Sequence, residues 1–308
     1  MQAKSKPDMT VQIGRMTMKN PVTTGSGTFA FGAEWADFYD LSRLGAITVK
    51  AVTVRPRAGN PMPRAVETAA GMLNSIGLQN PGLDAFIAEK MPYLREFDVP
   101  VIVNIAADRI EDFCTLAETL DDVPGISALE VNISCPNQAC GGIEFGTDPA
   151  LTRQVIESVR QRTKLTVIAK LSPNITDITL TARAAEDAGA DAVSLINTFV
   201  GTSINIKTRT FRLANRRGGV SGPCIKPMAL YMVWRVANAV KIPIIGMGGI
   251  NNADDAVEFM LAGASAIACG TVNFVNPMAA VEIAQGIEDY LISQGAGAVR
   301  DIIGTVIQ

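Results

Sequence analysis

The sequence predicts an α/β fold, most specifically a (β/α)8 TIM barrel that forms a single domain over residues 1–308. Three observations predict it. Eight short apolar runs recur along the chain, a longer segment with helical periodicity follows each run, and 308 residues is a typical length for such a barrel. A doubly wound sheet is the competing architecture. It would need fewer units or a second domain, and the sequence contains neither a linker nor a break in composition.

The eight runs are nearly continuous in apolar residues, which is typical of parallel strands buried on both faces. They span residues 21–27, 46–52, 99–106, 128–134, 166–172, 192–198, 243–249 and 266–271. The segments with helical periodicity span residues 33–44, 84–97, 109–120, 148–161, 176–189, 226–240, 252–263 and 276–294. Several of them begin with Asp or Asn and end on Gly, which are start and stop signals of a helix.

The remaining segments predict a floor and a set of shaped loops. The alternating stretch 10–20 predicts a short N-terminal hairpin that caps the floor of the barrel. The connections 53–82, 135–147 and 199–223 each follow a predicted strand, so they lie over the C-terminal face, where barrel active sites are built. Their many Gly, Asn and Pro residues favour shaped long βα loops over a cavity rather than disordered decoration.

The composition excludes several classes of function. Lys and Arg number 27 against 30 Asp and Glu, a net charge of −3, which provides no general attraction for nucleic acid or an acidic membrane. No apolar run approaches the roughly 20 residues of a membrane span, and no signal peptide is recognisable. The chain has no His, which excludes Ser-His-Asp and Cys-His catalysis. Its five Cys include no C-x-x-C pair, so we expect no metal or iron–sulfur site in this chain, and reduced thiols in the cytoplasm.

Polar residues and glycines occupy the C-terminal ends of the predicted strands. They are Ser26, Gly27, Lys50, Asn104, Asn132, Lys170, Asn197, Thr198, Gly248, Gly249, Gly270 and Thr271. Any one of them alone has a structural explanation, such as a turn Asn or a surface Lys, but their coincidence at the strand ends predicts a ligand site. The amides of Asn74, Asn132, Asn137 and Asn197 suit a planar ligand with carbonyl and ring N–H groups. Lys50 and Lys170 suit negative charge, either a carboxylate or the electron-rich end of a reduced flavin.

Two glycine motifs have opposite interpretations. GMGGI (246–250) and CGT (269–271) end the seventh and eighth predicted strands, where barrels bind phosphate groups, so they predict a cofactor phosphate site. GSGTFA (25–30) formally fits the G-x-G-x-x-G/A pattern of a dinucleotide site. Such a site requires an acidic residue at the end of the second strand, and Lys50 stands there, so we reject it.

Cys135 is the best candidate for a proton-transfer or nucleophilic group. It follows a buried strand within NISCPN (132–137) and lies in the same loop region as the Asn residues. An inert core thiol is the alternative, and a lysine with a strongly lowered pKa is the other candidate base. Cys140, five residues later, is either a solvent-facing thiol or a partner for a disulfide with Cys135.

Ten motifs across residues 10–290 make the chain resemble the dihydroorotate dehydrogenases, specifically the class 1B catalytic subunit. They are NPVTTGSGTF (20–29), ITVKAVT (47–53), GMLNSIGLQNPG (71–82), VPVIVNIA (99–106), LEVNISCPN (129–137), IAKLSPN (168–174), SLINT (194–198), GGVSGP (218–223), IIGMGGI (244–250) and CGT (269–271). The loop 138–142, the pair Arg216-Arg217 and Cys269 depart from the commoner family pattern.

The resemblance implies an FMN enzyme that oxidises (S)-dihydroorotate to orotate in pyrimidine (UMP) biosynthesis. Cys135 would remove the C5 proton while a hydride passes from C6 to N5 of FMN. The residues implied to hold FMN are Ser26, Gly27, Lys50, Ala51, Asn104, Asn132, Lys170, Ile196, Gly222, Gly248, Gly249, Gly270 and Thr271. Those implied to hold the substrate are Lys50, Asn74, Ser75, Ile76, Gly77, Leu78, Asn132, Asn137, Asn197 and Thr198.

The resemblance also implies a homodimeric core within a heterotetramer. An electron-transfer subunit that carries FAD and a 2Fe-2S cluster would pass the electrons to NAD+. Three alternatives stay open at this point: a class 1A-like enzyme that uses fumarate, a dihydropyrimidine dehydrogenase-like flavin reductase, and a barrel that binds a sugar phosphate, such as an aldolase.

Overall fold

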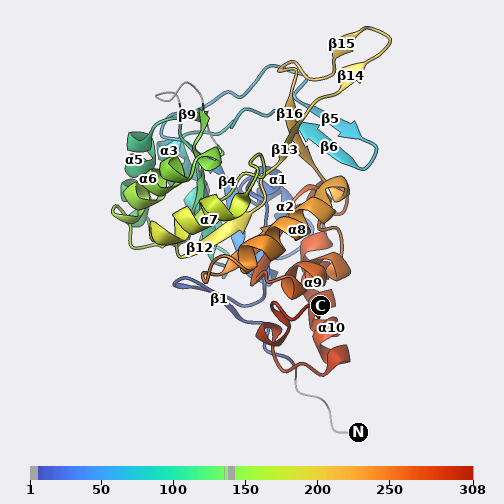
Figure 1. Cartoon of the computed structure of the whole chain (residues 1–308). Helices are drawn as coiled ribbons and strands as arrows, with labels where there is room; N and C mark the ends of the chain where they lie inside the picture. Colours follow the sequence, from blue (N-terminus) through green and yellow to red (C-terminus); the bar gives the residue numbers. More distant parts are fainter. Residues whose placement is uncertain (1–5, 135, 138–142, 308) are drawn as a thin grey trace.

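The computed structural model describes residues 6–134, 136–137 and 143–307. Within them, eight parallel strands form one sheet in the order β3-β18-β17-β12-β11-β8-β7-β4. They are β3 (Val22–Thr24), β4 (Ile47–Val52), β7 (Val101–Ile105), β8 (Ile126–Asn132), β11 (Thr166–Lys170), β12 (Ala192–Leu195), β17 (Ile244–Met247) and β18 (Ala266–Cys269). Each overlaps one predicted run, and the (β/α)8 barrel is confirmed (Figure 1).

Threonine side chains join β3 to β4, the two ends of this order. The Thr48 N–H donates to Thr24 Oγ1 at 3.0 Å, and the Thr24 hydroxyl donates to the Thr48 carbonyl at 3.2 Å. The hydroxyls of Thr23 and Thr48 lie 3.0 Å apart. All three residues are at most 3% exposed, so water does not compete for these groups. This threonine seam (Thr23, Thr24 and Thr48) closes the barrel where the strands meet.

Helices surround the sheet, and the predicted capping signals are confirmed in several of them. The long helices are α5 (Ile110–Asp121), α6 (Pro149–Arg160), α7 (Ile178–Asp187), α8 (Lys226–Ala237), α9 (Ala253–Leu261) and α10 (Ala279–Gln294). The side chains of Asp148, Asp177 and Asn252 accept from the first-turn N–H groups of α6, α7 and α9. Within the described residues, no helix is long and apolar enough to span a membrane.

The predicted helix over residues 33–44 is wrong, because two short pieces replace it, α2 (Ala33–Ala36) and the 3-10 turn η1 (Leu41–Arg43). A separate short helix, α1 (Ser26–Phe29), precedes them, and Gly32 with φ +88° separates it from α2. The backbone at Asp40 is extended (ψ 116°), so α2 cannot continue through it, and the Asp40 side chain accepts from the Ser42 N–H to start a new turn. The Trp35 ring stacks on Phe29 at 5.5 Å and anchors the segment.

The helical segment predicted over residues 84–97 is confirmed but contains a π-helical turn. Its pieces are α3 (Leu83–Ala85), the π turn η2 (Phe86–Lys90) and α4 (Met91–Leu94). Pro92 has no N–H to donate in α4, so the regular ladder of bonds is interrupted beside the π turn.

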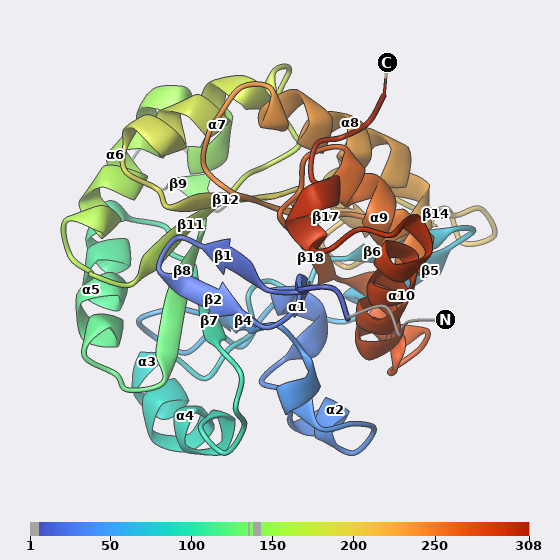
Figure 2. The ribbon, with the colours of Figure 1, turned by 90° about the horizontal axis from the view of Figure 1, so that it is seen from below.

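The N-terminal hairpin lies beneath the barrel, as predicted (Figure 2). Its strands are β1 (Val11–Ile13) and β2 (Met16–Met18), and the four residues at their ends are buried while Gln12 and Thr17 are exposed. The Arg15 N–H donates to the Thr166 hydroxyl at the start of β11, at 3.0 Å. The C-terminal 3-10 turn η7 (Val299–Ile302) packs near it through a bridge between Asp8 and Ala298.

The two longest connections pair with each other above the barrel. Residues 53–82 contribute β5 (Ala65–Thr68) and β6 (Gly71–Asn74), and residues 199–223 contribute β13 (Phe199–Gly201) and β16 (Gly218–Ser221). These strands form an antiparallel sheet in the order β13-β16-β6-β5, which we call the roof. β14 (Ile204–Asn205) and β15 (Thr210–Phe211) project from it as a hairpin (Figure 1).

Shorter elements complete the C-terminal face. β9 (Pro136–Asn137) pairs with β10 (Ile143–Glu144) after β8. The 3-10 turns η4 (Phe145–Thr147), η5 (Pro223–Ile225) and η6 (Thr271–Phe274) follow β10, β16 and β18. The buried apolar side chains of strands and helices form one continuous cluster that fills the barrel and its helical layer.

Candidate active site

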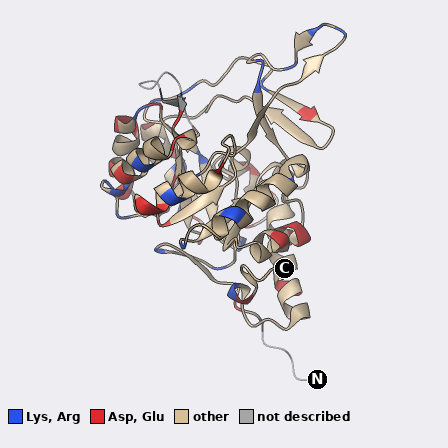
Figure 3. Ribbon diagram, viewed as in Figure 1, with Lys and Arg blue, Asp and Glu red and all other residues tan. Residues whose placement is uncertain are grey.

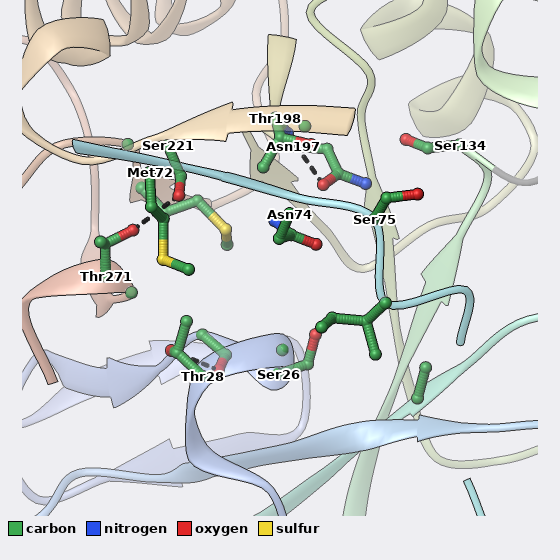
Figure 4. Close-up of a pocket in the computed structure, with 18 of the residues that line it drawn as sticks. Ser26, Thr28, Met72, Asn74, Ser75, Ser134, Asn197, Thr198, Ser221 and Thr271 are labelled. Carbon is green, nitrogen blue, oxygen red and sulfur yellow. Dashed lines mark hydrogen bonds between the residues drawn. The ribbon is translucent and has the colours of Figure 1, made fainter. Parts of the chain in front are cut away.

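A cavity of about 910 Å³ lies between the C-terminal ends of the barrel strands and the roof. Figure 4 shows Ser221 and Thr271 toward one end of it and Ser75 and Ser134 toward the other. The predicted site residues that line it are Ser26, Gly27, Lys50, Ala51, Asn74, Ser75, Ile76, Gly77, Leu78, Asn132, Lys170, Ile196, Asn197, Thr198, Gly222, Gly248, Gly249, Gly270 and Thr271. The fold therefore brings most of the predicted set to one cavity, although the set spans some 245 residues of sequence.

Four predicted residues need separate mention. Cys135 and Cys140 lie outside the described residues, as does the side chain of Asn137. Asn104, the penultimate residue of β7, is fully buried beneath the cavity rather than lining it, and its Nδ2 donates to Glu130 Oε2 at 2.5 Å. Its role in holding FMN stays a prediction.

Two lysines reach the cavity from opposite sides. Lys170, at the end of β11, is 6% exposed, and its ammonium lies 3.5 Å from both Ser26 Oγ and Glu130 Oε2. Lys50 comes from β4, and burial, with a smaller contribution from the nearby Arg64 guanidinium, lowers the pKa of its ammonium. The cavity therefore contains one ion-paired lysine and one whose charged form is disfavoured by burial.

Asparagine side chains form a connected group at the ends of β8 and β12. The Asn197 amide donates to Asn132 Oδ1 at 3.4 Å, and Asn197 Oδ1 accepts from the Thr198 N–H at 2.9 Å. Asn174, which the sequence analysis missed, donates to the Thr198 carbonyl at 3.1 Å and accepts from the Val200 N–H at 3.0 Å. Because each amide is held by a neighbour, the group presents donors and acceptors in fixed directions.

Glycines shape the opposite end of the cavity. Gly248 and Gly249 have φ +128° and +79°, and Gly222 has φ +102°. A Cβ at Gly249 would lie 2.8 Å from both the Gly222 carbonyl and the Lys226 backbone nitrogen, so only glycine fits this approach to the start of α8. The Lys226 side chain turns away to ion pairs with Asp255 at 2.6 Å and Glu258 at 3.0 Å. Backbone N–H groups at this end can hold an anion such as phosphate.

The roof and its neighbours add charged residues that the sequence analysis missed. Arg57, Arg64 and Glu144 line the cavity, and Arg57 pairs with Asp108 at 2.8 Å. Glu144 accepts from the Ser172 hydroxyl at 3.2 Å, and burial raises the pKa of its carboxyl. The only sequence feature that could have indicated these three residues is their position inside long βα connections. Nothing in the local sequence indicates which charged loop residues point into the cavity.

Charges elsewhere form no single field. Figure 3 shows basic and acidic residues interspersed along α5, α6 and α7. Cys269, at the end of β18, is fully buried, which raises the pKa of its thiol to about 12 and keeps it protonated. An anionic ligand must therefore be met by the cavity's own cations and backbone donors.

Comparison with known proteins identifies the family. The family model described as dihydroorotate dehydrogenase matches residues 8–291. The chain belongs to the dihydroorotate dehydrogenase family. The resemblance drawn from the sequence motifs is thereby confirmed, and the sugar-phosphate barrel is excluded.

Several relatives of the chain match it over nearly their whole length. The chain is 54% identical over 302 residues to the catalytic subunit of dihydroorotate dehydrogenase B (NAD(+)) of Geotalea uraniireducens, covering 98% of this chain and 99% of the relative. It is 54% identical over 301 residues to the protein of the same name from Pelobacter propionicus, with the same coverage. The corresponding protein of Thermoanaerobacter pseudethanolicus is 52% identical over 299 residues, covering 97% of this chain and 99% of the relative.

Proposed function

We propose that this protein is the FMN-binding catalytic subunit of a B-type dihydroorotate dehydrogenase, which oxidises (S)-dihydroorotate to orotate in pyrimidine biosynthesis. The observation that carries the proposal is the cavity itself. It combines two lysines, a fixed group of asparagine amides and a glycine-rich anion site at the mouth of a barrel. The names of the full-length relatives support the reaction and its link to NAD+.

The cavity and the residues buried beneath it fit FMN in three respects. Asn104 Oδ1 is buried without a hydrogen-bond partner among the described residues, and an N–H group of a ligand would satisfy it. A Cβ at Gly27 or Gly270 would meet no protein atom within 4 Å, so space for a ligand is open at both. Gly248, Gly249, Gly270 and Thr271 would hold the phosphate through backbone N–H groups. When bound, FMN supplies the acceptor for the hydride from C6 of the substrate.

The chain's own side chains bind and orient the substrate. Asn74, Asn132 and Asn197 offer amide donors and acceptors that match the ring amides of dihydroorotate. Lys50 meets the carboxylate, and this contact favours the charged form that burial alone disfavours. The roof strand β6 carries Asn74 and covers the site, which excludes water from the reacting face.

Cys135 is the group that we propose takes the proton from C5. It follows Ser134, which lines the cavity, so the chain enters the site immediately before it. A thiolate is the competent base, and a nearby lysine favours it over the thiol. A partner subunit that carries FAD and a 2Fe-2S cluster would receive the electrons, in an assembly with a homodimeric core; the relatives are named catalytic subunits, which supports such a partner.

Anaerobic stopped-flow flavin reduction tests the proposal. Dihydroorotate should reduce the bound flavin and dihydrouracil should not, since only the former has the carboxylate for Lys50. Cys135→Ala should keep FMN but slow reduction by roughly 10²–10⁴-fold, the usual contribution of a positioned acid–base group. Cys135→Ser should retain slightly more activity, and Cys114→Ser on α5 serves as the control thiol. A colourless protein, or unchanged reduction in Cys135→Ala, contradicts the proposal.

The electron acceptor is tested by co-expression with the partner subunit. We expect the purified complex to show iron–sulfur absorbance in addition to flavin bands and to reduce NAD+ with dihydroorotate. Fumarate reduction by the isolated chain at a comparable rate would instead assign it to the class that uses fumarate.

A further inference from the structure

A buried carboxylate lies directly beneath the cavity, and the reaction described above gives it no role. Glu130 is 2% exposed and sits in β8, in the middle of four adjacent strands of the barrel. Its Oε1 accepts from the Ser194 hydroxyl of β12 at 2.7 Å. Its Oε2 accepts from the Asn104 amide of β7 at 2.5 Å and lies 3.5 Å from the Lys170 ammonium of β11. One carboxylate thus ties together side chains from three other strands.

This arrangement is not what barrel stability requires. The rest of the barrel interior is filled largely by apolar side chains, and a buried ion pair of this kind is often no more stabilising than well-packed hydrophobic residues. Two of the three partners of Glu130 are instead residues that the proposed function uses. Asn104 keeps an unpartnered Oδ1, and Lys170 lines the cavity.

The contacts fix the orientation of both partners. The Lys170 side chain is long and flexible, with three donor hydrogens. Its described contacts are Glu130 below and Ser26 at 3.5 Å across the floor, so the ammonium is held between β8 and α1 with capacity left for a ligand. The Asn104 Nδ2 donates to Glu130, so Oδ1 is the atom of this amide that is available to a ligand.

We propose that Glu130 is a positioning residue that holds Lys170 and Asn104 against the flavin and offsets the charge of Lys170 there. The inference rests on the proposed function. Its consequence is electrostatic. Reduction places negative charge on the flavin ring, and charge beside the ring tunes the reduction potential. With Glu130 in place the floor carries a nearly neutral pair, so reduced FMN gains less than it would from an unopposed lysine.

Glu130→Gln in the FMN-loaded protein is the test, with the midpoint potential of the bound flavin as the readout. Glutamine keeps the shape and can still accept from Asn104, but it removes the negative charge. We expect the ratio of the affinities for reduced and oxidised FMN to rise at least about tenfold, which corresponds to ~30 mV for a two-electron couple. Loss of a merely structural contact would not raise the potential.

Asp191→Asn is the matched control. Asp191 pairs with Arg160 at 2.7 Å and accepts from the Val167 N–H at 2.8 Å, at the opposite end of the strands. The Asp191→Asn substitution removes the same unit of charge. The ratio of the affinities for reduced and oxidised FMN should nevertheless stay within about twofold of the wild-type ratio. An unchanged potential in Glu130→Gln, or an equal rise in Asp191→Asn, overturns the inference.

A second variant covers the case in which Glu130→Gln does not fold. Glu130→Asp keeps the charge but withdraws the carboxylate by one methylene from Asn104 and Lys170. We expect at least about tenfold weaker FMN binding to the apoprotein, and wild-type affinity would contradict the positioning role. If the wild-type protein binds no FMN, the proposed function fails; if it binds FMN and neither variant differs from it, only the role of Glu130 fails.

Discussion

The threonine seam offers a test of how the barrel is closed, because two isosteric substitutions at the same place should differ in cost. Thr24→Val removes the one hydroxyl that both accepts from the Thr48 N–H and donates to the Thr48 carbonyl. Both backbone groups are left buried beside a residue that is 1% exposed. At about 1–3 kcal/mol for each unsatisfied group, the loss is about 2–6 kcal/mol.

Thr48→Val removes much less. Its hydroxyl contacts only the Thr23 hydroxyl among the described residues, and the backbone bonds to Thr24 remain. The expected cost is about 1 kcal/mol. The assay is urea unfolding of the flavin-free protein followed by circular dichroism, with the two midpoints compared at equal m-values.

The costs of the two variants can be compared directly because both substitutions delete one buried oxygen and add one methyl group. A Thr24→Val cost within about 0.5 kcal/mol of the Thr48→Val cost would refute the conclusion that the Thr24 hydroxyl replaces a strand partner. Thr17→Val on the exposed face of the hairpin serves as the control and should change stability by less than about 0.5 kcal/mol.

Three further predictions concern the cavity. Gly27→Ala, in α1, should stabilise the apoprotein by about 0.5 kcal/mol, as measured by thermal melts. The added methyl group should weaken FMN binding by roughly 5- to 150-fold in a flavin titration, which corresponds to about 1–3 kcal/mol of overpacking. Because burial raises the pKa of Glu144 above 4.5, the associated stability is present below pH 4.5 and is lost as the pH rises through the folded-state value; unfolding midpoints should therefore favour Glu144→Gln over wild type more at pH 8 than at pH 4. Because burial lowers the pKa of Lys50, orotate affinity should begin to fall at a pH below 10.5 in wild type, and Lys50→Met should bind weakly without that dependence.

Each of these has a contrary result. Unchanged FMN affinity in Gly27→Ala would mean that the ligand does not approach α1. An equal effect of Glu144→Gln at both pH values would mean that its carboxyl titrates normally. The same alkaline loss of orotate affinity in Lys50→Met would assign the titration to another group.

The barrel strands could be predicted from sequence because burial on both faces requires a run of apolar residues, which is a local pattern. In the parallel strand 166–170 the residues between Thr166 and Lys170 are all apolar, and the charged end residue Lys170 then stands out. The helix predicted over residues 33–44 failed for the opposite reason. Its apolar residues fit helical spacing, but the backbone is extended at Asp40, whose side chain caps a new turn at the Ser42 N–H, so the helix is interrupted there.

The roof strands show no such local pattern of apolar residues. β5 and β16 have no buried residue, and β6 has one, so neither alternation nor an apolar run marks them. Their pairing depends on Gly219 meeting Asn74, a contact across about 145 residues of sequence that no local pattern encodes. The same holds for Glu130, which reads as an interruption of an apolar strand until its three partners on neighbouring strands are seen.

The roof is built from two distant segments of the chain, and this has a consequence for folding during translation. β6 arises early in the chain, but its partner β16 ends only at Ser221. A nascent polypeptide that has emerged as far as β12 carries Lys50, Asn74 and Lys170, yet lacks β16, which pairs with β6 above them. Contacts of such long sequence separation form late, after the segments between them have ordered. Under the proposed function, we therefore expect ribosome-bound fragments that end before Ser221 to bind no flavin.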